Sequence, residues 1–282
     1  MALIDFILNL AALLLWLNWR AAKSDPLGKR TPATLIGTLR RADARAAGRW
    51  QLPAVLGGLL LLRALFYWQI GSALKPVWAG KLDLGAIVLS IPCHESWSGL
   101  GRIIIFSFCS FAILLAVFYS WLIILSILGG PEPVQALVRV QLGRPNRWPV
   151  AVKWLLPFLL CSTAWWLASW LLAWLHIIPA PGAASRRLAG AAIIGLEPYP
   201  TLKFLFGALL SLYLLNSYIY FGKHPFWAYV NAVSQNLLRP IRIIPLRVGR
   251  VDFAPLIGIA AVFLLAQGAG YILARLYTHL AA

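Results

Sequence analysis

Long apolar segments, separated by polar loops, make up most of the chain. Six of them are close to or longer than the roughly 20 residues that a helix needs to cross the hydrocarbon core of a bilayer. This pattern predicts an all-α, polytopic membrane protein with about six transmembrane helices. The predicted helices cover residues 2–19, 53–71, 104–128, 151–178, 203–221 and 254–274.

Three apolar segments need separate interpretation. The first carries Asp5, and its basic residues follow the apolar run instead of preceding it, so we expect a membrane helix and not a cleaved signal peptide. The stretches at 84–91 and 188–196 are too short to span a bilayer. They are predicted to be interfacial or re-entrant segments, or caps over the helix bundle.

Lysine and arginine are unevenly distributed between the loops. Loops 20–50, 129–153 and 222–253 carry 17 of the 25 basic residues, whereas loops 72–103 and 179–203 carry three each. Cytoplasmic loops of membrane proteins are enriched in Lys and Arg. We therefore expect the three basic loops in the cytoplasm and both termini outside.

Composition supports a membrane protein over a nucleic-acid-binding one. Apolar residues make up 61% of the chain and charged residues only 12%, about half the share found in soluble proteins. A net charge of +17 would suggest nucleic acid in a soluble protein. Here, anionic lipid head groups and the positive-inside rule explain the basic loops, so no nucleic-acid partner is expected.

The spans are predicted to form three tandem helix–loop–helix repeats. In each repeat a basic loop closes on Gly-Arg or Asn-Arg, followed by Trp50, Trp148 or Val251. Two crossings per repeat make the repeats parallel, unlike the inverted repeats common in transporters. The predicted repeats are 1–103, 104–202 and 203–282, the first two ending in an outer connector.

The loop at 224–259 has the clearest local pattern. Its apolar residues recur at helical spacing from Phe226 to Leu237, which predicts an interfacial amphipathic helix. Pro240 is expected to end this helix, because a proline disfavours helical geometry in the residue before it. The Arg-Pro-Ile-Arg segment that follows is predicted to be a rigid, extended strip at the membrane surface.

This loop and the helix after it resemble the YggT family of small bacterial and plastid membrane proteins. The resemblance covers residues 205–280 and implies an integral protein of the bacterial cytoplasmic (inner) membrane. Relatives are linked with osmotic tolerance, with nucleoid or plastid division and with assembly of cytochrome complexes, which implies an accessory or assembly role. The matching residues are Asn231, Leu238, Arg239, Pro240, Ile241, Arg242, Pro245, Gly249, Val251, Asp252, Phe253, Ala254 and Pro255.

Basic residues of this segment are candidates for binding lipid phosphate or an acidic partner, because arginine can hold two phosphate oxygens at once. The alternative is that they only determine topology. The binding candidates are Arg239, Arg242, Arg247 and Arg250, with Asn231 on the preceding helix.

A second group of motif residues is expected to be structural. Asp252 is predicted to cap the last helix or pair with a nearby arginine, in preference to carrying protons, since a proton carrier would lie deeper in the span. The structural candidates are Pro240, Pro245, Gly249, Asp252 and Pro255.

Arg63 is the most unusual residue within a predicted span. A charge in the middle of a bilayer costs several kcal/mol on most scales unless it is paired or hydrated. Arg63 therefore marks a cavity, an acidic partner subunit, or a helix tilted enough for its side chain to reach the interface. Asp5 is a possible partner, although its position near the chain start is unfavourable.

No pattern in the chain predicts a metal, a cofactor or a catalytic centre. Cys93, Cys109 and Cys161 show no C-x-x-C spacing, and the Cys93-His94-Glu95 sequence lacks a second histidine at ligand spacing. Nucleotide-binding and hydrolase motifs are missing as well. We therefore expect no metal, no cofactor and no enzymatic activity.

Two functions from different classes compete. The first is a non-catalytic accessory, assembly or scaffold protein that docks to a membrane complex, to a second copy of itself or to anionic lipids through its basic loops. The alternative is a transporter or channel for ions or small solutes, with Arg63 lining a polar path. The spans favour the first function, because apart from Arg63 they hold few polar groups that could line such a path.

Overall fold

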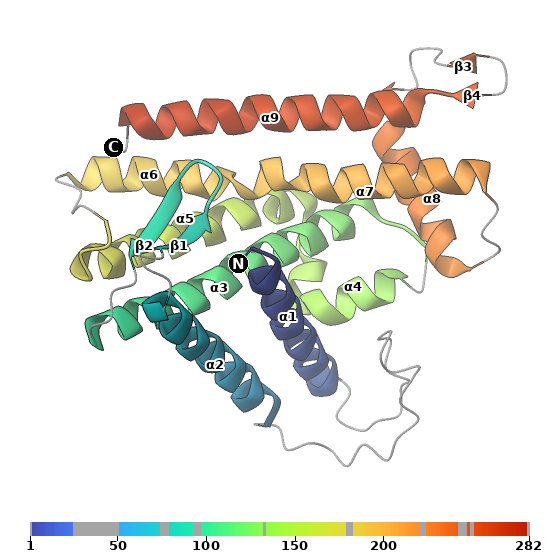
Figure 1. The fold of residues 1–282 in the computed structure, drawn as a ribbon. Coiled ribbons are helices and arrows are strands. Elements are labelled where there is room, and N and C mark those ends of the chain that lie inside the picture. The colour runs from blue at the N-terminus through green and yellow to red at the C-terminus, as the bar shows by residue number, and fades with distance from the viewer. Residues whose placement is uncertain are drawn as a thin grey trace. The chain divides into compact units, whose positions relative to one another are not determined.

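The computed structural model contains the six predicted membrane helices and shorter elements between them (Figure 1). It describes residues 2–24, 51–73, 79–92, 97–131, 134–178, 183–219, 224–241, 247–248 and 251–280. The membrane helices are α1 (Ala2–Ser24), α2 (Gln51–Ala73), α3 (Trp97–Leu128), α5 (Val150–Trp174), α7 (Pro198–Tyr218) and α9 (Ala254–Leu280). The other elements are β1 (Ala79–Asp83), β2 (Val88–Pro92), α4 (Val134–Leu142), η1 (Arg144–Arg147), α6 (Ala184–Leu196), α8 (Pro225–Leu238), β3 (Arg247–Val248) and β4 (Val251–Asp252).

The chain divides into two compact units, and the main boundary between them lies within α3. The first comprises Met1–Leu84 and Val88–Leu115, and the second comprises Gly85–Ile87 and Ala116–Ala282. The predicted boundaries at 103 and 202 and the three-repeat organisation stay predictions.

The first unit is held together by apolar contacts between α1, α2 and α3. Ala12, Leu56, Leu60 and Phe111 are each less than 10% exposed and form one cluster. Ala12 on α1 faces Leu56 and Leu60 on α2, whereas Asp5, nearer the start of α1, faces residues further along α2. The two helices are therefore antiparallel neighbours, as expected for consecutive membrane crossings.

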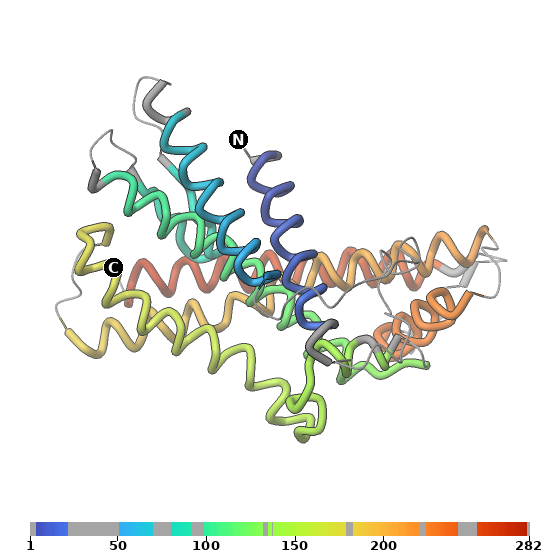
Figure 2. The backbone as a smooth tube through the Cα atoms, turned by 90° about the horizontal axis from the view of Figure 1, so that it is seen from below, coloured from blue at the N-terminus to red at the C-terminus, as the bar shows by residue number. Residues whose placement is uncertain are grey.

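In the second unit, α9 runs alongside α7, and the two views agree on this pairing (Figures 1 and 2). The contact is close where a glycine of one helix faces a large side chain of the other. A Cβ atom on Gly207 of α7 would lie 2.7 Å from Phe263 of α9, and one on Gly258 of α9 would lie 3.2 Å from Leu210 of α7. The amphipathic α8 packs Tyr229, Val230 and Val233 against α7, which confirms the helix predicted between residues 226 and 237.

The two short apolar stretches lie in elements of different kinds. Residues 188–196 lie inside α6, and Glu197 continues the helical backbone into α7, so that Ala184–Tyr218 is a single apolar length of 35 residues. Residues 84–91 cover the turn and most of the second strand of an antiparallel hairpin, in which Asp83 pairs with Val88. Among the residues that the structure describes, the fold is therefore all-α except for this hairpin and the two-residue strands β3 and β4.

The fourth membrane helix is shorter than predicted. It ends at Trp174, and His176 has a positive φ of 57°, which breaks the helical backbone before the predicted end at residue 178. Pro157 lies inside this helix and is buried, and the helix continues through it.

Candidate functional site

Arg63 lies buried at the centre of a polar cluster in the first unit. Its side chain is only 1% exposed and hydrogen-bonds to side chains from two other helices. One terminal nitrogen donates to Oδ1 of Asn9 at 2.7 Å, and the other donates to Oδ1 of Asp5 at 2.6 Å and to Oγ of Ser110 at 3.2 Å. The guanidinium group of Arg63 therefore links α2 to both α1 and α3.

Tyr67 completes this cluster from one turn further along α2. Its hydroxyl donates to Oδ1 of Asp5 at 2.5 Å, so this carboxylate oxygen accepts from both Tyr67 and Arg63. The guanidinium carbon lies 5.6 Å from the ring centroids of both Tyr67 and Phe106, within cation–π range. We refer to Asp5, Asn9, Arg63, Tyr67, Phe106 and Ser110 as the Arg63 cluster.

The Arg63 cluster offsets the free-energy cost of placing a charge in a membrane span. Moving an isolated ion out of water costs several kcal/mol even after relaxation, and the cost is offset only when an opposite charge and well-placed hydrogen bonds surround the ion. Arg63 has both. The acidic partner is Asp5 of the same chain, so neither an acid from another subunit nor a water-filled cavity is needed to explain Arg63.

Asn231, a candidate binding residue, takes part in an internal hydrogen bond. Its Oδ1 accepts from Nδ2 of Asn216 at 3.1 Å, which joins α8 to α7. Two further bonds hold α8 in place: Ser234 donates to the carbonyl of Leu209 at 3.1 Å, and Asn236 donates to the carbonyl of Leu128 at 3.1 Å. These contacts assign Asn231 a packing role and leave its binding role a prediction.

Arg239 lies exposed in the turn that follows α8. The helix ends at Leu238, two residues before Pro240, in agreement with the predicted effect of this proline. Pro255 is buried in the first turn of α9, where a proline lacks no needed hydrogen bond. Arg242, Pro245, Gly249 and Arg250 lie outside the described residues.

Asp252 is the last residue of β4 and lies two positions before the first residue of α9. The first helical hydrogen bond runs from the backbone nitrogen of Ile257 to the carbonyl of Phe253 at 3.1 Å, so Phe253 occupies the capping position. Asp252 instead lies opposite Arg247 across the β3–β4 hairpin. The backbone register places Asp252 across from an arginine, and both roles expected of this residue, a helix cap or an arginine partner, stay predictions.

One segment of the second unit matches a known protein family. Residues 199–273 match the CCB3/YggT family. The match spans nearly all of α7, all of α8 and the β3–β4 hairpin, and most of α9, and it confirms the predicted resemblance. It covers about a quarter of the chain. No curated protein and no solved structure matches the chain.

Within the matched residues 199–273, which we call the YggT segment, Tyr229 of α8 has a raised pKa. Its side chain is 3% exposed, and its hydroxyl has no hydrogen-bond partner among the described residues. Burial raises the pKa of Tyr229 from 10.0 to about 12, because removal from water disfavours the charged phenolate. The hydroxyl therefore stays protonated under physiological conditions, and the residue acts as a packing group.

Glu197, just before the YggT segment, is a buried acid that was not among the candidate site residues. This acid is 8% exposed at the junction of α6 and α7. Its carboxylate lies against Gly85, where an added Cβ would approach Oε2 to 1.9 Å, and a positive φ of 82° also favours glycine. Treating 188–221 as one span would have exposed this buried acid, because an ionisable residue inside a span is itself a signal.

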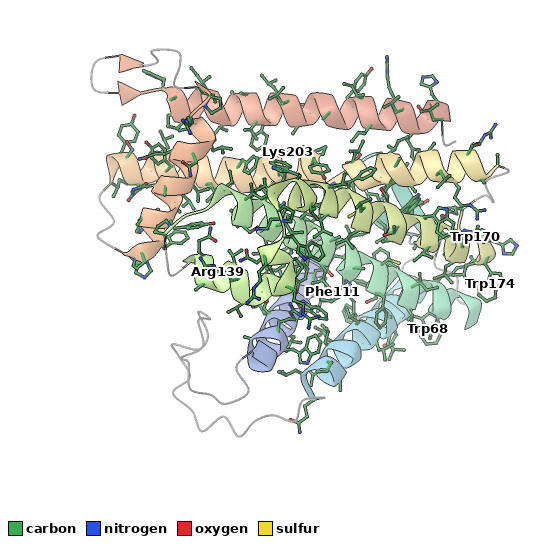
Figure 3. The ribbon with its side chains drawn as sticks, turned by 180° about the vertical axis from the view of Figure 1, so that it is seen from behind. Trp68, Phe111, Arg139, Trp170, Trp174 and Lys203 are labelled. Atoms are coloured by element: carbon green, nitrogen blue, oxygen red, sulfur yellow. The ribbon has the colours of Figure 1, made fainter. Side chains whose placement is uncertain are left out.

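Aromatic and basic residues also meet at the end of α5. The guanidinium of Arg187 lies 3.9 Å from the ring centroid of Trp170, and Trp170 and Trp174 are both more than half exposed near the end of this helix (Figure 3). Exposed tryptophans at helix ends are typical of anchoring at the membrane interface.

Metal ligands are not grouped in the described part of the chain. No three His, Cys, Asp or Glu side chains among those residues lie close enough together to hold an ion. The Cys93-His94-Glu95 sequence falls outside the described ranges.

Proposed function

We propose that this protein is a non-catalytic accessory or assembly protein of a membrane complex, which docks to an acidic partner or to anionic lipid through its basic loops. The observation that carries the proposal is the internal pairing of both terminal nitrogens of the Arg63 guanidinium. Its charge is bound by Asp5, Asn9 and Ser110, which ties three helices together. The match of residues 199–273 to the CCB3/YggT family supports the same class of function.

This pairing argues against the alternative of a transporter or channel. A residue that lines a solute path exchanges partners with water or with the solute, whereas the Arg63 side chain is 1% exposed and hydrogen-bonded within its own unit. The one basic residue expected to line a polar path is therefore used to hold helices together.

Docking would use the basic residues that the second unit exposes. Arg139 on α4 and Arg144 and Arg147 on η1 are exposed in one basic loop (Figure 3 labels Arg139), and Arg239 is exposed in another. Arginine suits this task, because its planar guanidinium binds carboxylate or phosphate oxygens in pairs. We further propose a bacterial inner-membrane location with these loops in the cytoplasm and both termini outside.

Purification in a mild detergent, followed by mass spectrometry of co-purifying proteins and bound phospholipids, tests this function. The double variant Arg144→Gln/Arg239→Gln removes two exposed charges on the predicted docking side. The matched control Lys81→Gln/Arg186→Gln removes two exposed charges from the predicted outer loops. We expect the first variant to lose about tenfold or more of the bound partner or anionic lipid, and the control to retain it.

Two results would contradict the proposal. One is a wild-type chain recovered with no other protein and no enrichment of anionic lipid. The other is equal loss of the bound material in both double variants, since docking would then not depend on the basic loops.

A further inference from the structure

Helix α9 carries a row of exposed residues on the side away from α7. Pro255, Gly258 and Leu273 are buried on its packed side. On the other side, exposed residues recur at alternating steps of three and four, the spacing that lets two helices interlock their side chains. This row, which we call the α9 seam, consists of Ile257, Ala260, Leu264, Gln267 and Tyr271.

Gln267 is out of place on a surface that faces lipid. It is the middle residue of α9, about 20 Å from either end of the helix, so its side chain is far too short to reach water. Its amide is exposed and forms no side-chain hydrogen bond to any described residue. A polar group that faces hydrocarbon without a partner is costly, and polar side chains in spans therefore promote helix association.

We infer that the α9 seam binds the α9 seam of a second copy of this chain, with Gln267 paired to Gln267 across a two-fold axis. An amide is complementary to itself, because each carries both a donor and an acceptor. Two copies with the same topology also place this residue at the same depth, so a parallel pair brings the amides together without further adjustment.

Small residues beside Gln267 allow the backbones to approach. Ala260 lies two turns before it on the seam, and a Cβ atom on neighbouring Gly268 would meet no atom of its own chain within 4 Å. Close contact at small residues is the usual geometry of associating membrane helices. This pairing does not rest on the docking role of the basic loops, and the two are tested by different measurements.

Site-directed disulfide formation in membranes tests the pairing. In a variant whose three native cysteines are replaced by alanine, Leu264→Cys puts a thiol on the seam. Leu265→Cys puts one about 100° around the helix at a site equally open to lipid, since the two leucines are 70% and 75% exposed. We expect oxidation to convert Leu264→Cys, and not Leu265→Cys, to a covalent dimer.

The Gln267 amide is tested separately in the uncross-linked protein. Gln267→Leu is expected to raise the dimer dissociation constant, measured by sedimentation equilibrium in detergent, about threefold to thirtyfold, whereas Gln267→Asn keeps an amide and most of the dimer. Helix content by circular dichroism checks that each variant folds. Equal cross-linking at residues 264 and 265, or a dimer unaffected by Gln267→Leu, would overturn the inference.

Discussion

At the scale of single residues, the structure depends on charged and polar groups of different helices that bind one another. The Arg63 cluster joins three helices through one guanidinium, and its acidic member Asp5 is 26% exposed whereas Arg63 is almost completely buried. Breaking such a pair costs more than the pair contributes, because one charge is left buried without compensation. Substitutions on the two sides of the pair should therefore be strongly non-additive.

Replacement of Asp5 tests the structural role of this cluster. We expect Asp5→Asn to lower the free energy of unfolding by about 3 kcal/mol, because the Arg63 charge would remain in a membrane span without a counter-ion. Fluorescence-detected thermal unfolding in detergent measures the loss. The double variant Asp5→Asn/Arg63→Met should recover part of it. An Asp5→Asn variant as stable as the wild type would show that the ion pair does not hold the helices.

Tyr229 gives a prediction about pH. With a pKa of about 12 in the folded state and 10.0 as the ordinary value, the phenol ionises first in the unfolded chain as the pH rises. Its effect on stability is therefore absent below about pH 10 and becomes a loss between pH 10 and 12. Tyr229→Phe should match or exceed wild-type stability at pH 7, because its buried hydroxyl lacks a partner, and should resist alkaline unfolding better.

Thermal unfolding measured from pH 8 to pH 11.5 checks the Tyr229 prediction. Tyr218→Phe, at a tyrosine that is 61% exposed, serves as the control and should follow the wild type throughout. If the Tyr229→Phe and wild-type curves stayed parallel above pH 10, burial of this phenol would not be the cause of the alkaline loss.

At the scale of elements, close helix contacts depend on glycines. A Cβ atom on Gly195 of α6 would lie 1.9 Å from Oγ of Ser162 and 2.9 Å from the backbone carbonyl of Phe158, both on α5. The serine can rotate away, but the backbone oxygen cannot move without shifting the helix. Gly195 therefore sets the spacing between α5 and α6.

Gly195→Ala is expected to destabilise the protein by about 1–3 kcal/mol through overpacking. Gly270→Ala on α9 is the matched control, because an added Cβ there meets no atom within 4 Å. The control should be neutral or slightly stabilising, since alanine favours helix over glycine by about 1 kcal/mol. Thermal unfolding of the two variants side by side provides the comparison, and equal stabilities would contradict this role of Gly195.

The elements that hydrophobicity alone specifies could be predicted from the sequence. Each of the six membrane helices overlaps its predicted segment, with α3 starting at Trp97 instead of residue 104 and α9 ending at Leu280 instead of residue 274. The stretch at 84–91 became a hairpin because a short apolar run fits a strand as well as a helix. The stretch at 188–196 is too short to span a bilayer by itself and was therefore separated from the next helix, whereas the backbone at Glu197 stays helical and joins the two.

The candidate site was predictable only in part, for a related reason. Arg63 could be recognised as a candidate because it is a charged residue in an apolar span. Its partners lie on α1 and α3, and the local sequence does not show which helices pack together. Asp5 lies near the start of the chain, which made it an unfavourable partner for a residue in the middle of a span. Its pairing with Arg63 shows that position along the chain is a poor guide to depth in the membrane. In the YggT segment, the motif located α8 and its end correctly, yet it could not show that Asn231 is bonded to Asn216.

At the scale of the whole molecule, the distribution of charge supports a docking protein. The chain carries 25 basic residues and only 8 acidic ones, and 17 of the basic residues lie in three loops that are predicted to share one side of the membrane. Such a surface attracts anionic lipid or an acidic protein over a range limited by salt screening. Arg63 lies within a membrane helix and does not belong to this surface, because Asp5, Asn9 and Ser110 bind its side chain.

We propose that the Arg63 charge holds helices together and does not serve a solute path. The most direct test is flux of K⁺, Na⁺, Cl⁻ and protons into sealed liposomes that contain the purified wild-type protein, measured with ion-sensitive dyes. The account predicts the same flux as in empty liposomes. Flux through the wild type that is abolished in a folded Arg63→Leu variant would contradict it.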